Sequence, residues 1–237
     1  MSHDAHIPAM TDAQTPLGIQ IIPVTPFAQN CSLLWDTKTK AAVLIDPGGE
    51  ADRLVSELGA RGLTLKEMWL THGHLDHAGA ADELRERLGA PVIGPHADDQ
   101  FWMDGISAQW SAYGHPGMGR DVVPDRYLED GEVLRFAGLD FEVIHAPGHT
   151  PGHVVILQAD LGVAFVGDVL FAGSIGRTDF PKGDHATLIR SIKERLLPRG
   201  DHIQFVPGHG PASTFGRERQ SNPFLVAGAG ANTSGVG

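Results

Sequence analysis

The 237-residue chain has a single cysteine, Cys31, and lacks any long apolar segment. One cysteine excludes an intrachain disulfide and fits a reducing compartment. Because Cys31 lies beside an apolar stretch, a packed side chain is favoured over a nucleophile. No stretch approaches the ~20 apolar residues of a membrane span, and the first residues show neither the basic nor the apolar segment of a signal peptide. We therefore expect a cytoplasmic protein.

Basic residues are also scarce, since 18 lysines and arginines stand against 29 aspartates and glutamates, for a net charge of −11. Sequence-independent binding to nucleic acid needs a surplus of basic side chains to neutralise phosphates. Anionic membrane surfaces attract proteins through similar basic clusters. We expect neither nucleic acid nor a membrane as a partner.

Short apolar stretches separated by turn residues predict strands, and apolar residues at helical spacing predict helices. The predicted strands cover residues 17–24, 32–35, 41–45, 68–71, 91–94, 132–136, 140–145, 153–158, 163–167 and 203–206. The predicted helices cover about 50–58, 81–88, 95–103 and 188–196. The predicted elements form two rounds of strands followed by helices, without an internal repeat of fixed period.

Residues 104–126 show no periodicity and mix glycine and proline with Trp110, Tyr113 and Met118. The stretch is long for a connection in a compact domain, so it is predicted to form a lid or substrate wall, or else a packed surface loop.

Residues 71–77 have the sequence THGHLDH and follow a predicted strand directly. The motif supplies four possible metal ligands: His72, His74, Asp76 and His77. Imidazole nitrogens and carboxylates suit zinc and other divalent first-row ions. With 13 histidines in the chain, a polar turn without function is the alternative, and only the context of the motif can exclude it.

Three further donors follow predicted strands: His149 in PGHT, Asp168 in GD and His209 in PGHG. Because strand ends converge at the rim of a sheet, residues distant in sequence can meet there. Seven donors are too many for one tetrahedral zinc and suit two ions that share a bridging carboxylate. The positions of these donors therefore predict a two-metal site.

The ordered set THGHLDH, PGHT, GD and PGHG resembles the metallo-β-lactamase superfamily over nearly the whole chain. The resemblance implies an α/β fold, an αββα sandwich of two mixed β-sheets with external helices. It implies one hydrolase domain over residues 17–226. Residues 1–16 and 227–237, which are polar or small, are expected to be flexible tails.

The resemblance also implies two metal positions with one shared carboxylate: His72, His74 and His149 at the first, Asp76, His77 and His209 at the second, and Asp168 between them. Two divalent ions are expected, with zinc favoured over iron or manganese. They would hold a hydroxide that attacks a carbonyl carbon, because metal binding lowers the pKa of water toward ~7. Asp76 and Asp168 are the candidate catalytic carboxylates. Such a site hydrolyses esters, thioesters, lactones or amides.

Two further segments, residues 173–180 and 217–224, resemble the short form of the glyoxalase II group, the hydroxyacylglutathione hydrolases. In that group a basic residue holds the glycine carboxylate of glutathione, and Arg177 matches its position. An ion pair of Arg177 with Asp179 or Glu218 is the alternative role. The expected substrate is a small-molecule thioester, S-lactoylglutathione above all. Because the chain lacks the helical C-terminal domain of the larger enzymes, a wider range of acyl thioesters is also open.

Two rival functions remain. The persulfide dioxygenase branch shares the histidine motif and the GRTDF segment, but it uses a single iron held by two histidines and one aspartate. His209 suits a second metal and favours the hydrolase. A lactonase or β-lactamase is the other rival, but neither of these two activities accounts for the segment that contains Arg177. The sequence makes no prediction of oligomeric state.

Some polar and aromatic residues near the motifs have open roles. Asp46, at the end of a predicted strand, and His153, four residues after His149, could orient metal ligands or could serve a turn and the core. Trp102, Trp110 and Tyr113 could line an acyl pocket or pack in the core.

Overall fold

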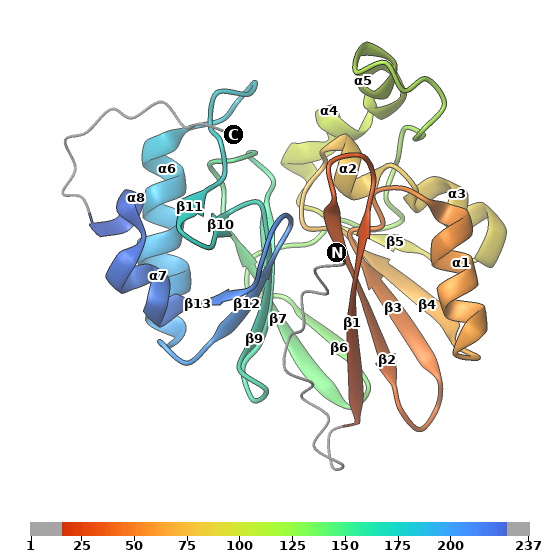
Figure 1. Ribbon diagram of the computed structural model, residues 1–237, viewed down its shortest axis with the longest axis horizontal. Coiled ribbons are helices and arrows are strands. Elements are labelled where there is room, and N and C mark those ends of the chain that lie inside the picture. The colour runs from red at the N-terminus through yellow and green to blue at the C-terminus, as the bar shows by residue number, and fades with distance from the viewer. Residues whose placement is uncertain (1–15, 227–237) are drawn as a thin grey trace, which may run out of the picture.

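Two β-sheets lie face to face between two layers of helices in the computed structural model, which describes residues 16–226 (Figure 1). The five-stranded sheet has the order β1-β2-β3-β4-β5, and the six-stranded sheet has the order β13-β12-β9-β8-β7-β6. Both sheets mix parallel and antiparallel pairs. The structure therefore confirms the predicted αββα sandwich.

The first half of the chain forms the five-stranded sheet and the helices on its outer side. Its strands are β1 (Leu17–Val24), β2 (Gln29–Asp36), β3 (Ala41–Ile45), β4 (Thr64–Trp69) and β5 (Val92–Ile93). Its helices are α1 (Ala51–Ala60), α2 (Leu75–Ala78), α3 (Ala81–Leu88), the 3₁₀ turn η1 (Ala97–Asp99), α4 (Gln100–Met103) and α5 (Ile106–Ala112). Since α2 begins inside THGHLDH, Asp76 and His77 lie on a helical turn rather than in a loop.

The second half forms the six-stranded sheet and the opposite helical layer. Its sheet contains β6 (Val133–Phe136), β7 (Leu139–His145), β8 (Val154–Gln158), β9 (Val163–Gly167), β12 (Gln204–Pro207) and β13 (Ser213–Thr214). A separate hairpin pairs β10 (Leu170–Phe171) with β11 (Ser174–Ile175). The helices are α6 (His185–Arg190), η2 (Ser191–Leu196), η3 (Leu197–Arg199), α7 (Phe215–Ser221) and α8 (Pro223–Val226).

Alternating side chains on the strands build three apolar layers. In β3, Leu44 packs on the side of the helices, whereas Val43 lies between the two sheets. In β8, Val155 packs toward the second helical layer, whereas Ile156 lies between the sheets. A strand buried on both faces reads as a continuous apolar run, which is why these segments were recognisable in the sequence.

One edge of the sandwich collects the carboxyl ends of several strands. Strands β3 and β4 are parallel, and so are β9 and β12. Strand β7 runs in the same direction as β9, because both are antiparallel to β8. The loops after β4, β7, β9 and β12, which carry the predicted metal ligands, therefore leave the sheets on the same side, as the sequence analysis expected.

Helix α5 lies within the stretch 104–126, where no regular element was predicted, so that part of the prediction is wrong. Ile106 and Trp110, four residues apart, are fully buried and give the helix its apolar side. Two apolar residues one helical turn apart, among glycines and polar residues, are too few to reveal a helical period in the sequence. The rest of the stretch contains no further helix.

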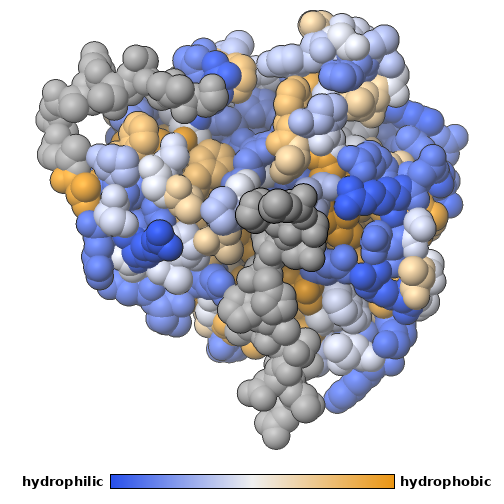
Figure 2. Space-filling view, in the orientation of Figure 1, coloured by the Kyte–Doolittle hydropathy of each residue, from blue (hydrophilic) through white to orange (hydrophobic). Residues whose placement is uncertain are grey.

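The surface seen in Figure 2 is largely hydrophilic, with smaller apolar patches toward its middle. Among residues 16–226, no helix is long and apolar enough to cross a membrane. The predicted flexible tails fall outside the described residues, apart from Pro16, whose carbonyl accepts the Thr37 N–H.

Candidate metal centre

The seven predicted donors come together at the edge where the strand ends meet, and they form two groups of three with one carboxylate between them. We call His72, His74 and His149 the three-histidine group, and Asp76, His77 and His209 the Asp76 group. Six of the seven side chains are buried, and only His209 is partly exposed. Such burial keeps bulk water away from all but one side of the centre.

The three-histidine group has the spacing that a single ion requires. The Nδ1 atom of His74 lies 3.1 Å from Nε2 of His72 and 3.0 Å from Nε2 of His149. Nitrogens bound at about 2.0–2.1 Å to a tetrahedral zinc lie about 3.3 Å apart, so small shifts would complete the geometry. Burial, reinforced by neighbouring imidazoles, lowers the pKa of His72 and His74, which favours neutral rings with free lone pairs.

Hydrogen bonds on the outer side of the rings fix which nitrogen faces inward. The Nδ1–H of His149 donates to the Arg177 carbonyl at 2.7 Å, which leaves Nε2 free as a ligand. The Nδ1 atom of His72 lies 3.1 Å from the hydroxyl oxygen of Thr71. Partners of this kind hold the orientation and tautomer of a metal-binding histidine.

The Asp76 group is oriented in the same way. The Nδ1–H of His77 donates to Asp46 at 2.9 Å, and that of His209 donates to the carbonyl of Phe27 at 3.1 Å. Both Nε2 atoms then face Asp76, whose Oδ2 lies 3.1 Å from His209 and 3.9 Å from His77. One carboxylate and two imidazoles therefore converge at the second position.

Asp168 lies between the two groups. Its Oδ1 is 3.4 Å from Nε2 of His77, and its Oδ2 is 3.6 Å from Nε2 of His149 and 3.7 Å from Nε2 of His209. Oδ1 of Asp168 and Nε2 of His77 are buried, and neither has a hydrogen-bond partner among the described residues. An unpaired buried polar group costs about 1–3 kcal/mol, and metal ligation would satisfy both atoms. The donor set therefore fits two ions bridged by Asp168.

Charges within the centre offset one another. Burial alone would raise the pKa of Asp168, but His77 and His209 hold it well below the usual range. Burial alone would lower the pKa of His77, but Asp168 and Asp76 outweigh it and raise that pKa well above the usual value. The pKa of His209 is raised for the same reason. Without metal, the Asp76 group therefore favours protonated histidines paired with carboxylates.

Asp46 orients part of this centre, which settles one of the roles left open by the sequence. It accepts hydrogen bonds from the backbone N–H of Thr71 at 2.7 Å, the Thr71 hydroxyl at 2.6 Å and His77. Its φ of 53° lies in the left-handed region, where non-glycine residues are uncommon and often functional. Asp46 thus holds the start of THGHLDH and one of its ligands at once.

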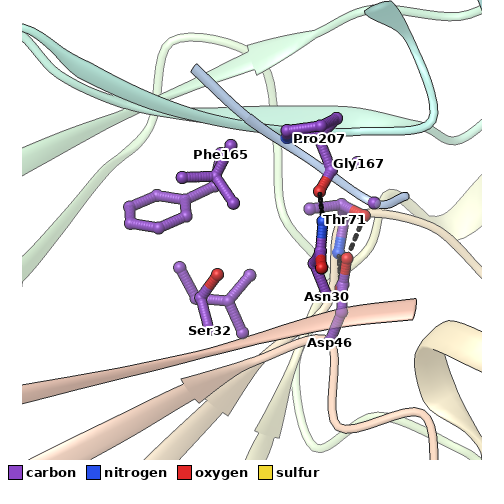
Figure 3. A pocket seen from close by; sticks show the side chains of 10 residues that line it. Asn30, Ser32, Asp46, Thr71, Phe165, Gly167 and Pro207 are labelled. Carbon is purple, nitrogen blue, oxygen red and sulfur yellow. Dashed lines mark hydrogen bonds between the residues drawn. The ribbon is translucent and has the colours of Figure 1, made fainter. Parts of the chain in front are cut away.

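A small cavity lies behind these residues, between the two sheets. Figure 3 shows Asp46 and Thr71 on one side of it, with Asn30 beside Pro207. The cavity measures about 10 Å³, close to the minimum for one water molecule. The Asn30 side chain donates to the carbonyls of Pro207 and Gly210, which ties β2 to the loop that carries His209.

His153 also supports the centre. Its Nε2 accepts the backbone N–H of Asp168 at 3.0 Å, and its ring stacks on His72 with centroids 4.6 Å apart. It therefore holds the backbone at Asp168 and packs against a donor ring, rather than serving only as a packed core residue. One further residue, Asp99, contacts both ligand loops, although no local pattern in the sequence pointed to it.

Arg177 lies beside the three-histidine group but already has a partner. Its guanidinium donates two hydrogen bonds to Asp179, at 2.7 and 2.6 Å, and covers the ring of Phe180 at 4.1 Å. The pair with Asp179 is one of the two ion pairs expected as alternatives. The other candidate, Glu218, instead accepts hydrogen bonds from the Gly173 N–H, the Ser213 hydroxyl and the Asn222 amide. Binding of a substrate carboxylate by Arg177 remains a prediction.

Aromatic rings surround the centre. Trp102 and Phe180 approach His74 with centroid distances of 4.6 and 5.2 Å. On the side of His209, Phe27 stacks on Trp110 at 5.5 Å and meets the exposed Tyr113 edge-on. Of the three aromatic residues with open roles, Trp102 contacts a donor, Trp110 is buried in the core and Tyr113 is exposed.

Comparison with known proteins gives consistent matches. The model of the metallo-beta-lactamase superfamily matches residues 24–209. The hydroxyacylglutathione hydrolase GloC of Haemophilus influenzae is 49% identical over 210 residues, covering 88% of this chain and 98% of the relative.

Solved structures match as well. The BLEG-1 B3 metallo-beta-lactamase superposes with a TM-score of 0.81 at 36% identity, covering 88% of this chain and 100% of the other. TTHA1623, solved in a di-iron-bound form, gives a TM-score of 0.78 at 37% identity, covering 87% and 100%.

Proposed function

The chain belongs to the metallo-β-lactamase superfamily, and on this basis we propose that it is a metal-dependent hydrolase that cleaves S-lactoylglutathione to glutathione and lactate. The observation that carries the reaction is the pair of three-ligand groups with Asp168 between them. The observation that supports the substrate is the 49% identity to a hydroxyacylglutathione hydrolase across nearly its full length.

Two divalent ions bound at these groups would supply a hydroxide nucleophile at neutral pH and would polarise the thioester carbonyl. The residues of the chain itself orient the ligands: Asp46 holds His77, and the Arg177 carbonyl holds His149. Cys31 is no substitute nucleophile, because it is fully buried and burial raises the pKa of its thiol well above the usual value.

The mouth of the centre offers charge for an anionic substrate in a protein that is otherwise strongly acidic. Arg177 is half exposed and stands above Phe180, whose ring lies beside His74. A glutathione carboxylate would replace Asp179 as the partner of the guanidinium. Because this replacement is an exchange of one carboxylate for another, the expected gain in affinity is moderate.

Zinc is the proposed metal, because the donors are imidazoles and carboxylates, which suit this ion. TTHA1623 was solved with two irons, so iron is the alternative to test by metal analysis. The cytoplasm remains the proposed location, since a lone free cysteine fits a reducing compartment.

A persulfide dioxygenase with a single iron is the second candidate, and the complete Asp76 group weighs against it. The two functions separate in a paired assay on purified enzyme: hydrolysis of S-lactoylglutathione against oxygen consumption with glutathione persulfide. A lactone and a β-lactam complete the panel. We expect thioester hydrolysis to exceed the other activities. Oxygen consumption without thioester hydrolysis would overturn the proposal in favour of the dioxygenase.

A further inference from the structure

Asp99 is a fully buried carboxylate that belongs to neither donor group. It ends the turn η1 and accepts three hydrogen bonds: from the Gly73 N–H at 2.9 Å, the Thr150 hydroxyl at 2.7 Å and the Gly152 N–H at 2.6 Å. None of these three partners carries a positive charge. Burial therefore dominates, and it raises the pKa of Asp99 to about 6. Burying a carboxylate without a cationic partner is costly, so its presence here calls for a role.

The three partners of Asp99 all come from the loops that carry the three-histidine group. Gly73 stands between His72 and His74, while Thr150 directly follows His149. These loops follow strands of different sheets, β4 in one and β7 in the other. One carboxylate thus links two loops whose separation sets the distance between the ligand nitrogens.

Close packing leaves this arrangement little freedom. A Cβ atom on Gly73 would lie 2.8 Å from the Asp99 carbonyl oxygen, and one on Gly152 would lie 2.6 Å from the Asp99 nitrogen. Both distances are too short for a real side chain. The His96 N–H adds a backbone bond to the Gly152 carbonyl at 3.1 Å. The segment around Asp99 is therefore fitted tightly between the two ligand loops.

His74 depends on this segment more than the other ligands do. Its Nε2 atom is buried and has no hydrogen-bond partner among the described residues, whereas His149 is held by a carbonyl. Its ring meets Trp102 and Phe180 edge-on, besides the rings of His72 and His149 from the same group. The position of its Nδ1 atom consequently follows the backbone at Gly73, which Asp99 holds.

We propose that Asp99 is a positioning residue for the first metal position: it sets the spacing of the Gly73 and Thr150 backbones, and thereby of His74 and His149. Loss of such a support typically weakens metal binding about 10- to 100-fold. The Asp76 group should keep its affinity, because Asp46 and the Phe27 carbonyl orient it instead. This inference rests on metal binding by the proposed hydrolase, and it is independent of the substrate.

The test uses Asp99→Asn and Thr150→Val, with Asp160→Asn as the matched control, because Asp160 is exposed at the turn between β8 and β9 and belongs to neither donor group. Each metal-free protein is titrated with zinc against a chromophoric chelator, and cobalt(II) spectra identify which position fills. Asp99→Asn keeps the size of the side chain, but its amide NH₂ would face one of the N–H or O–H groups that donate to the Asp99 carboxylate. It should weaken the three-histidine position about 10- to 100-fold, Thr150→Val should weaken it less, and the control should match the wild type.

Thermal unfolding of the metal-free variants separates positioning from a merely structural role. Selective loss of affinity at the first position, with the second unchanged, supports the proposal. Wild-type affinity at both positions in Asp99→Asn would overturn it, and so would equal weakening of both positions alongside a lower unfolding temperature. The chelator titration needs no substrate, so failure of the thioesterase assay would leave its outcome unchanged.

Discussion

Asp168 is the residue on which both donor groups depend, because its two oxygens face histidines of different groups. The paired charges also explain why a carboxylate can stay ionised at a buried position. An amide in its place would keep the shape and lose the charge. The effect of such a change therefore measures the bridging role directly.

We expect Asp168→Asn to lower the affinity for both ions and to reduce turnover by orders of magnitude. Metal content after dialysis and kcat for S-lactoylglutathione are the measurements. Asp160→Asn is the control, since Asp160 is exposed at the turn between β8 and β9. Full metal loading with unchanged turnover in Asp168→Asn would contradict the bridging assignment.

Arg177 is expected to act on substrate binding alone. Arg177→Ala should raise KM for glutathione thioesters about tenfold and change KM for small uncharged thioesters little, because only the former carry carboxylates. Steady-state kinetics with both substrate types make the comparison. Arg135→Ala removes an exposed arginine from β6 and serves as the control. Equal losses with both substrate types in Arg177→Ala would refute the role.

At the scale of elements, the loops after β4 and β7 hold the three-histidine group, whereas α2 and the loop after β12 hold the Asp76 group. The two groups differ in protonation. Burial lowers the pKa values of the three-histidine group below the usual 6.5, so its rings are neutral at pH 7. Carboxylates raise those of His77 and His209 above 6.5, so protons compete with metal there.

The second ion should therefore release protons on binding, and the first should release few. As the pH falls, affinity at the Asp76 group should decline first, since its histidines protonate at higher pH. The protons released can be counted by titration calorimetry of the metal-free protein in buffers of different ionisation enthalpy. The titration is repeated over ~2 pH units around neutrality. Proton release confined to the first ion would be the opposite of this expectation.

Elements whose burial appears as a continuous pattern of neighbouring apolar residues were predicted from the sequence. Elements whose burial depends on a few residues or on distant contacts were not. Strands such as β8, which is buried on both faces, appear in the sequence as continuous apolar runs. Helix α5 was missed, because its burial rests on Ile106 and Trp110 alone. The hairpin of β10 and β11 accepts and donates hydrogen bonds with Asn222 and with Glu218 of α7, and no local pattern in the sequence reports these distant contacts.

For the molecule as a whole, the fold was predictable from the resemblance of the ordered motifs to a known superfamily. The convergence of the donors was predictable because polar ligands directly follow apolar strands. The supports of the donors were predictable only in part: Asp46 and His153 were candidates for orienting ligands, whereas nothing in the sequence pointed to Asp99. Asp99 acts through hydrogen bonds to residues 26 and 51 positions away, and Asp46 acts through bonds 25 and 31 positions away. The partners of Asp46 follow the neighbouring strand β4 of the same sheet, whereas Thr150 follows β7 of the other sheet, so these contacts exist only in the folded protein.

The central claim is a hydrolase that needs both donor groups filled. The most direct measurement is the rate of S-lactoylglutathione hydrolysis as zinc is added to the metal-free protein in stoichiometric steps. The structure predicts little activity with one ion per chain and full activity with two, because Asp168 and the Asp76 group are complete only then. Full hydrolytic activity with a single ion per chain, or none at any loading, would contradict it.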